Sequence, residues 1–446
     1  MRNQEDNYQF LTTAPVHRVI GTMAVPTIIT MLVTSIYNMV DTFFVGQIDT
    51  QSTAAVGIVF SVMFFMQAFG FYFGHGSGNY ISRELGAKRH GNARRMASTG
   101  FFFSLFFGVA FLIIGELLCH QLSIWLGSTP TILPYTESYM SIILLGAPFL
   151  TASLTLNNQM RLQGNASLAM YGIVAGAVLN CVLDPLFIFV FHMGVSGAAI
   201  ATVVGQAVSF VILVRLSHRP QNIGIRWRDF SPSWRIFREI FYGGSPSLSR
   251  QGLGCVATIA LNLSAGAYGD AAIAAMSIVN RITMLVMAAV VGLGQGFQPL
   301  CGFCYGAHLF GRLKSAYWFT VKVGTVFLVA CAMVGIPFSH EVIAVFRNDP
   351  DVIAVGSVAL VWQLASYPLN ALVMTSNMMT QTCRKPWRAN LLAAARRGLY
   401  FIPLIIVLPH FFGLLGVEMC QTVSDVLAFV TTVPIMIYTF KQLEKE

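Results

Sequence analysis

Long apolar runs recur along the whole chain, and short polar segments separate them. A helix of about 20 apolar residues crosses roughly 30 Å of hydrocarbon, the thickness of a bilayer core. The pattern therefore predicts an all-α integral membrane fold with about twelve membrane-spanning helices. Their expected ranges are 18–44, 52–76, 95–117, 132–160, 166–191, 194–216, 240–265, 272–300, 314–337, 351–379, 390–409 and 415–438.

The two halves of the chain repeat one pattern of glycines and prolines. An offset of 220 residues aligns Pro26 with Pro246 and continues through further matched pairs. These pairs are Gly46 and Gly266, Gly74 and Gly294, Gly86 and Gly306, Gly91 and Gly311, Pro148 and Pro368, and Asn157 and Asn377. Each copy contains six predicted spans, an even number, so both copies enter the membrane in the same direction as parallel repeats.

The repeat predicts two six-helix lobes, residues 1–216 and 240–446. The longest polar interruption, residues 217–239, is expected to join them on the cytoplasmic side. Its Ser231-Pro232 pair, followed by aromatic and basic residues, predicts a short helix lying in the membrane interface. Transporters built from such repeats commonly place their substrate between the two halves.

Composition supports a membrane protein and excludes other classes. Of the 446 residues, 55% are apolar and 10% are charged, whereas soluble domains carry about a quarter charged residues. The net charge of +9 does not indicate nucleic-acid binding, because the basic residues are dispersed among short connections. They concentrate in alternate connections, including 83–95, 215–238 and 384–388, and this bias predicts that both termini are cytoplasmic.

Four acidic residues lie within or near the predicted spans: Asp41, Asp184, Asp425 and Glu116. A carboxylate inside a bilayer is costly to keep ionised without partners, so such residues are functional candidates by default. Asp41 and Asp184 lie at equal depth in the outer halves of their spans and are expected to face each other. Asp425 has no comparable polar partners in the sequence, and Glu116 is expected at the interface.

Polar side chains share the helix faces of the paired acids. Tyr37 lies four residues before Asp41, and Asn180 lies four before Asp184, a spacing that puts each pair on one face. Thr202 lies within reach if the sixth span packs beside the fifth. These oxygens suit Na⁺, or a proton shared by carboxyls that burial and mutual repulsion keep partly neutral. The alternative is a structural network at a helix interface.

Pro26 lies inside the first predicted span, where it removes a backbone hydrogen bond and permits a kink. It is a candidate hinge, although prolines are also simply tolerated in membrane helices. Its repeat mate is Pro246, whereas Asp41 aligns with Leu261. The paired acids therefore belong to the first copy alone.

Two further features have weaker support. Cys301 and Cys304 form a CxxC spacing, but no second pair accompanies it, so zinc or redox chemistry is not expected. Arg281 falls within the eighth predicted span, where it either meets an anionic substrate or pairs with a neighbouring polar group. The nine histidines show no hydrolase or metalloenzyme motif, so neither catalytic residues nor a cofactor are predicted.

Several segments match one known family. They are Pro26 with YNMVDTFFVGQ at 37–47, SRELGAKRHGNARR at 82–95, LNCVLDPLFIF at 179–189, GVSGAAIATVVGQ at 194–206, RDFSP at 228–232 and NRITML at 280–285. The chain thereby resembles the multidrug and toxic compound extrusion (MATE) family, in its DinF-like and MepA-like bacterial branch. The resemblance implies two six-helix lobes around a central cleft, and export of amphipathic, often cationic compounds in exchange for H⁺ or Na⁺.

The resemblance also implies roles for particular residues. It places the cation site at Asp41, Asn180, Asp184 and Thr202, and it places Tyr37 and Asn157 near that site in the substrate cavity. Other branches carry acidic ligands in the first and fourth helices of the second lobe. Here those spans have only Glu239 and Asp351 at their edges, so coupling is expected in the first lobe.

We therefore expect a cation-coupled antiporter, not an enzyme, that works by alternating access in the inner (cytoplasmic) membrane and is sufficient as a monomer. Uptake of H⁺ or Na⁺ at Asp41 and Asp184 is expected to change the bend near Pro26 and displace small-molecule substrate outward. The nearest alternative is a lipid-linked oligosaccharide flippase, whose anionic phosphates would require basic residues that the first-lobe spans lack. A membrane-bound transferase is the alternative of another class. The natural substrate and the choice between H⁺ and Na⁺ stay open.

Overall fold

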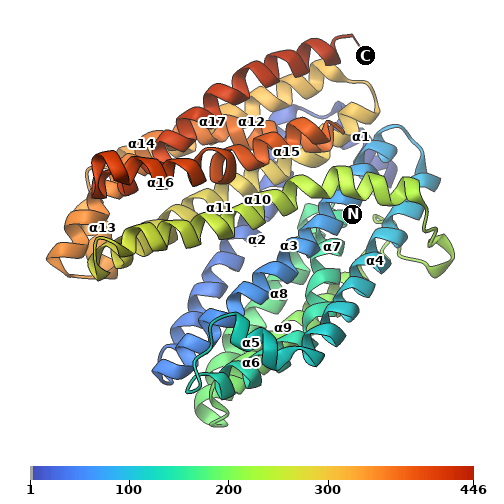
Figure 1. The fold of residues 1–446 in the computed structure, drawn as a ribbon. Coiled ribbons are helices and arrows are strands. Elements are labelled where there is room, and N and C mark those ends of the chain that lie inside the picture. The colour runs from blue at the N-terminus through green and yellow to red at the C-terminus, as the bar shows by residue number, and fades with distance from the viewer. Residues whose placement is uncertain (1–3, 446) are drawn as a thin grey trace.

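The computed structural model describes residues 4–445 and forms helices without any strand in that range (Figure 1). The first lobe contains α2 (Val16–Val45), α3 (Thr50–Gly86), α4 (His90–Leu117), α5 (Cys119–Trp125), α6 (Leu133–Leu145), α7 (Ala147–Leu162), α8 (Ala166–Pro185), η1 (Leu186–Val190) and α9 (Gly194–Ser217). The second contains α10 (Trp234–Gly266), α11 (Asp270–Gly306), α12 (Phe310–Gly335), α13 (Ser339–Phe346), α14 (Pro350–Thr382), α15 (Pro386–Ala394), η3 (Ala395–Leu399), α16 (Phe401–Phe412) and α17 (Leu414–Leu443). Helix α1 (Gln4–Thr13) precedes the first lobe, and the short helix η2 (Trp227–Asp229) lies between the lobes.

Up to eleven helical segments among the described residues meet the length and apolarity needed to cross a bilayer, and α10 adds a twelfth crossing as the repeat mate of α2. Ten are long and apolar enough to span a bilayer, and α6 with α7 forms an eleventh that is bent by 47°. Helix α10 is the twelfth; it is 33 residues long but less apolar, because it carries Arg235, Arg238, Glu239 and Arg250. The chain is a multi-pass membrane protein, and the predicted all-α fold with two repeated lobes is confirmed.

Several expected connections are helical. Helix α3 continues to Gly86 and α4 begins at His90, so most of the predicted loop 82–95 belongs to these helices. Arg161, predicted in a cytoplasmic connection, is buried in the last turn of α7 and donates to Gln298 Oε1 of α11 at 3.1 Å. In the predicted linker 217–239, residues from Trp234 onward are the first turns of α10. The division of the chain at that linker stays a prediction.

The repeat reaches the level of single hydrogen bonds. Asn157 Nδ2 of α7 donates to the carbonyl of Ala169 at 2.8 Å. In the second lobe, Asn377 Nδ2 donates to the carbonyl of Ala389 at 2.7 Å, and both residues are shifted by the same 220 positions. The scaffold of the two lobes is therefore duplicated in its geometry as well as in its sequence.

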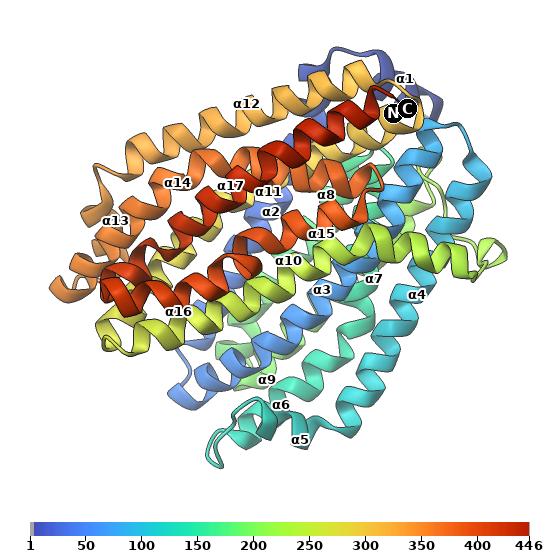
Figure 2. The same ribbon diagram turned by 45° about the horizontal axis from the view of Figure 1, so that its top comes forward.

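The lobes touch through two equivalent helix crossings, α2 with α11 and α3 with α10. Glycines make both crossings possible: a Cβ on Gly296 would overlap Ala24 of α2, and a Cβ on Gly76 would overlap Ile240 of α10. Figures 1 and 2 show that the lobes meet near the end that carries both termini and diverge toward the other end. The two lobes thus form a V that is closed at the end where both termini lie.

Candidate functional site

Helices α2 and α8 bring two carboxyl groups together inside the first lobe. Asp41 is 8% exposed and Asp184 is fully buried, and the two carboxyl groups lie close enough for each charge to act on the other. Helix α8 ends at Pro185, immediately after Asp184, and gives way to the π-helical turn η1. Such turns are frequent at functional sites because they re-aim neighbouring side chains. The structure therefore places Asp41 and Asp184 side by side, as their equal depth in the predicted spans indicated.

Polar groups from two more helices complete this cluster. Asn180 Nδ2 of α8 donates to Thr202 Oγ1 of α9 at 3.1 Å, and Tyr37 of α2 lines the same cavity as these two residues. The buried Tyr139 of α6 lies close to both carboxyls and to Tyr37. Sequence reasoning missed Tyr139, because a tyrosine in an apolar span carries no periodic or charge signal.

Five buried oxygens of this cluster have no hydrogen-bond partner among the described residues. They are Asp41 Oδ1, Tyr139 OH, Asn180 Oδ1 and both carboxyl oxygens of Asp184. Each unsatisfied buried polar atom costs about 1–3 kcal/mol, and more when it is charged. A group of converging acceptors without donors is chemically suited to a bound cation, either Na⁺ or a proton on the carboxyl pair.

A cavity of about 90 Å³ opens beside the cluster within the first lobe. Tyr37, Asn180 and Thr202 line this cavity and also belong to the carboxylate cluster. Other lining residues include Asn38, Met63, Gln67, Leu154, Ile173 and Gln206. The wall is thus mostly apolar with neutral amides, which suits an amphipathic compound.

Asn157, predicted in the substrate cavity, does not line it. Its side-chain amide is 7% exposed and is used in the structural bond to Ala169 that the second lobe repeats. Pro26 is buried in α2 next to the crossing with α11, where Gly292 and Gly296 have no side chains, and its role as a hinge stays a prediction.

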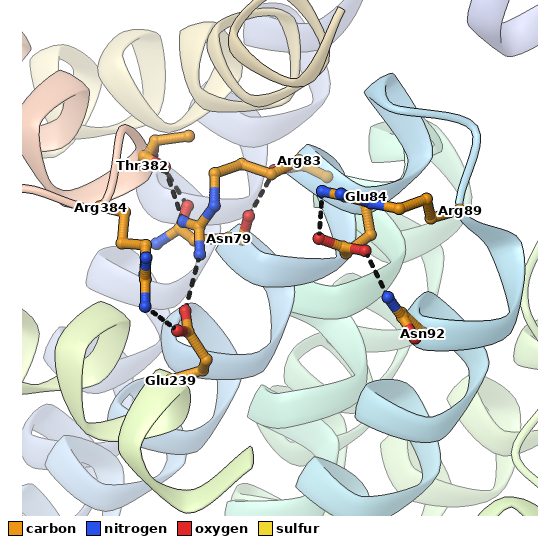
Figure 3. A network of polar contacts seen from close by, with 9 residues as sticks. Asn79, Arg83, Glu84, Arg89, Asn92, Glu239, Thr382 and Arg384 are labelled. Carbon is orange, nitrogen blue, oxygen red and sulfur yellow. Dashed lines mark hydrogen bonds and ion pairs between the residues drawn. The ribbon is translucent and has the colours of Figure 1, made fainter. Parts of the chain in front are cut away.

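The closed end holds a buried ion-pair network between the lobes (Figure 3). Glu239 of α10 is 4% exposed and binds two arginines, Arg83 of α3 at 3.2 Å and Arg384 at 2.6 Å. Arg83 Nη1 also donates to the carbonyl of Thr382 in α14 at 2.7 Å. The network therefore ties α3 of the first lobe to α10 and α14 of the second.

Glu239→Gln is expected to loosen the closed end. The substitution removes the charge that pairs two arginines, one of them buried, and breaking a buried pair costs about 3–5 kcal/mol. Cys301 and Cys383 are fully buried at this end, so their labelling by a membrane-impermeant maleimide should accelerate at least tenfold. Glu84→Gln is the matched control, because the partners of Glu84 are Arg89 and Asn92 of its own lobe. Equal labelling rates in the two variants would contradict this role.

The second lobe contains a buried polar centre that sequence reasoning did not find. Asp425, thought to lack partners, accepts from Arg396 Nε at 2.7 Å, Asn370 Nδ2 at 2.8 Å and Gln421 Nε2 at 2.8 Å. The signal was available, because Arg396 and Arg397 are adjacent bases inside an otherwise apolar run. Arg281, by contrast, is exposed and makes no ion pair or hydrogen bond with the described residues. Of its two predicted roles, pairing with a polar neighbour is not observed, and contact with an anionic substrate stays a prediction.

The duplicated fold has a known counterpart. The MatE family model matches residues 26–186 and, a second time, residues 246–407. The chain belongs to the MatE family. The resemblance found in the sequence motifs is thereby confirmed, and the two matches coincide with the two copies of the repeat.

Relatives of this MatE protein include named exporters. The multidrug export protein MepA of Staphylococcus haemolyticus (strain JCSC1435) is 27% identical over 396 residues, which cover 88% of this chain and 87% of MepA. A multidrug resistance MATE family transporter of the MOP superfamily in an outward-facing conformation superimposes with a TM-score of 0.93 at 26% identity, covering 99% of both chains. A MATE protein crystallised in a bent conformation superimposes with a TM-score of 0.91 at 26% identity, covering 98% of both chains.

Proposed function

We propose that this MatE protein is a cation-coupled antiporter that exports amphipathic, often cationic compounds. One observation carries the proposal: Tyr37, Asn180 and Thr202 belong both to the carboxylate cluster and to the wall of the first-lobe cavity. A cation that binds the cluster and a substrate that fills the cavity would therefore act on the same side chains. The names of the MepA and MATE relatives support export of more than one compound.

The cavity wall has the chemistry for weak polar contacts with diverse substrates. Ser153 Oγ, Ser209 Oγ and Gln206 Oε1 are buried there without a partner in the described part of the chain. Around them lie leucine, isoleucine and methionine side chains that can pack against an apolar body. An amphipathic compound satisfies both features, and a cationic one is further attracted by the nearby acids.

Alternating access requires the lobes to exchange their closed and open ends. The V-shaped arrangement corresponds to an outward-open state if the termini are cytoplasmic, as the distribution of basic residues predicts. Pro26 leaves the carbonyl one turn before it without its helical donor, so α2 can change its bend there at low cost. We propose that cation uptake at Asp41 and Asp184 drives this change.

Two imposed gradients test the proposal. Proteoliposomes that contain the purified chain are loaded with a cationic dye, and efflux is measured with a pH gradient and, separately, with a Na⁺ gradient. One elementary charge crossing 100 mV provides about 2.3 kcal/mol, and one pH unit about 1.4 kcal/mol. For one proton exchanged against one singly charged dye cation no net charge crosses, so one pH unit sustains a dye gradient of about tenfold, and the voltage adds to it only if more than one proton is exchanged. Efflux that responds to neither gradient would refute cation coupling.

A second function, a lipid-linked oligosaccharide flippase, has one observation in its favour. The second-lobe pocket contains Arg396 and Arg397, and basic residues are what a lipid phosphate requires. However, this pocket has a volume of about 20 Å³, enough for a small group but too little for a pyrophosphate headgroup. Scrambling of a labelled isoprenoid phospholipid by the same proteoliposomes, without dye efflux, would favour the flippase.

We further propose that the protein acts in the inner (cytoplasmic) membrane, with both termini in the cytoplasm, and that a single chain is sufficient. Each of the two lobes contributes a pocket or cluster of its own, and the crossings between them are internal to one chain. Dye efflux from proteoliposomes reconstituted at a protein-to-lipid ratio that gives at most one chain per vesicle would test this sufficiency.

A further inference from the structure

The second lobe has a pocket of its own, with a character opposite to that of the first-lobe cavity. It lies among α10, α11, α14, η3, α16 and α17, and it is lined in part by Thr258, Asn280, Gln363, Tyr367, Arg396 and Arg397. Two guanidinium groups and several neutral hydrogen-bonding side chains therefore converge on a small space. The π-helical turn η3 presents both arginines from adjacent positions.

The two arginines have different surroundings. Arg396 pairs with Asp425 at 2.7 Å and also hydrogen-bonds Tyr367. Arg397 is half-buried and forms no ion pair or hydrogen bond with any residue between 4 and 445. Charged side chains at membrane depth normally pair with an opposite charge or with backbone carbonyls, so an unpaired one marks a functional position.

The first lobe has the same scaffold without these charges. Shifted back by 220 residues, Arg396 and Asp425 correspond to Gly176 and Gly205. In the first lobe these two glycines pack backbone against backbone, because a Cβ on either would come within 2.8 Å of the other's carbonyl oxygen. Arg397 corresponds to Ala177. Where the first lobe has a close helix contact, the second lobe thus has the ion pair of Arg396 and Asp425 and a second arginine, Arg397.

The charge balance around the pocket is positive. Arg250 of α10, one turn before Gly254, donates to the neutral amide oxygen of Asn377 at 2.8 Å. A Cβ on Gly254 would lie 3.8 Å from Cδ and Nη1 of Arg397. Of the two arginines that line the pocket, Arg396 is paired with Asp425, so Arg397 contributes the unpaired positive charge and a guanidinium fork for two parallel hydrogen bonds. That geometry matches a carboxylate.

We propose that Arg397 binds a carboxylate of the transported compound, so that the second lobe selects substrates that carry an anionic group. This inference rests on the proposed exporter function and adds a substrate class to it: zwitterionic amphiphiles, with the carboxylate in the second lobe and the cationic or apolar body toward the first. The volume of about 20 Å³ admits a carboxylate but not a larger acidic headgroup.

A pair of dyes that differ in one group provides the probe. Tetramethylrhodamine has a free benzoate carboxylate, and its methyl ester lacks that charge but keeps the same cationic ring system. Binding of each dye to the purified full-length chain in nanodiscs is measured by fluorescence polarisation. Arg397→Met should weaken binding of the free carboxylate at least tenfold and change binding of the ester less than twofold, and Arg397→Lys should recover part of the loss.

Gly254→Asp tests the same site without removing the arginine. The introduced carboxylate lies close enough to pair with Arg397, so it should compete with the dye carboxylate and weaken its binding at least tenfold. Gly254→Asn adds a side chain of equal size without the charge and should bind both dyes as the unmodified chain does. Retained binding of the ester by each variant shows that the chain has folded.

Three results would overturn the inference: no binding of the free carboxylate to the unmodified chain, equal losses for both dyes in Arg397→Met, or a loss that follows Arg281→Met instead.

Efflux of the ester under an imposed ion gradient reports separately on the proposed function. A chain that binds the carboxylate through Arg397 but exports neither dye would contradict the exporter while leaving the anion site intact. A chain that exports the ester but binds both dyes equally well would support the exporter and contradict the anion site at Arg397.

Discussion

Ion-driven efflux of a cationic dye from proteoliposomes is expected to fall to the leak rate in Asp41→Asn and in Asp184→Asn. Each substitution removes one ionisable group from the pair, so two carboxyls no longer share a proton or coordinate Na⁺ together. Asparagine keeps the size of the side chain, so the helices α2 and α8 should pack as before. The measurement is the initial rate of efflux under a pH or Na⁺ gradient.

The same variants should not lose stability. Asp184 has no donor to either carboxyl oxygen among the described residues, and Asp41 lacks one to Oδ1, so removing one charge relieves repulsion in a buried site. An apparent melting temperature equal to or above that of the unmodified chain is therefore expected. Glu116→Gln is the control, because Glu116 is an exposed acid at the end of α4 in the same lobe. Full ion-driven efflux in both aspartate variants would disprove coupling at this pair.

Asp425→Leu is expected to destabilise the second lobe by about 3–5 kcal/mol, the typical cost of leaving one member of a buried ion pair uncompensated. Asp425 is fully buried, and its carboxylate accepts from side chains of α14, η3 and α17. Without it, Arg396 stays buried with a positive charge and no counter-ion. The free energy of unfolding in mixed micelles, measured by titration with a denaturing detergent, reports the effect.

The double variant Arg396→Leu with Asp425→Leu should recover most of the lost stability, because replacing a buried pair by apolar residues is often neutral. The exposed pair of Lys314 and Glu444, at 3.0 Å, is the reference for a surface contact. Glu444→Gln should change the free energy of unfolding by less than about 1 kcal/mol. A single variant Asp425→Leu as stable as the unmodified chain would show that Arg396 does not depend on this partner.

Spans were predictable because the bilayer imposes one dominant constraint. Backbone groups in hydrocarbon must be satisfied within the helix, and a helix must be apolar and long enough to cross. The predicted and observed helices accordingly coincide for α2, α9 and α17 within a few residues. Helix α3 runs to Gly86 because its last turns are buried between the lobes rather than ending at the membrane surface.

The carboxylate cluster was predictable in part. Asp41 and Asp184 stand out because acids are rare at membrane depth, and Tyr37 and Asn180 follow from helical spacing. Gln421, four residues before Asp425 on α17, follows from the same spacing. Tyr139 and the pairing of Asp425 with Arg396 and Asn370 do not, because these side chains come from other helices. Which helix faces which is decided by packing, and no local pattern encodes it.

By itself, the sequence determined that this protein crosses the membrane about twelve times, that its halves are parallel copies, and that the first copy carries paired acids. These properties follow from composition, spacing and repetition along one chain. The tertiary structure decided which groups meet: the unsatisfied oxygens around Asp41 and Asp184, the Glu239 network at the closed end, and the pairing of Arg396 but not Arg397. Such contacts depend on how helices pack across lobes, because a charge gains or lacks a partner only when its neighbours in space are fixed.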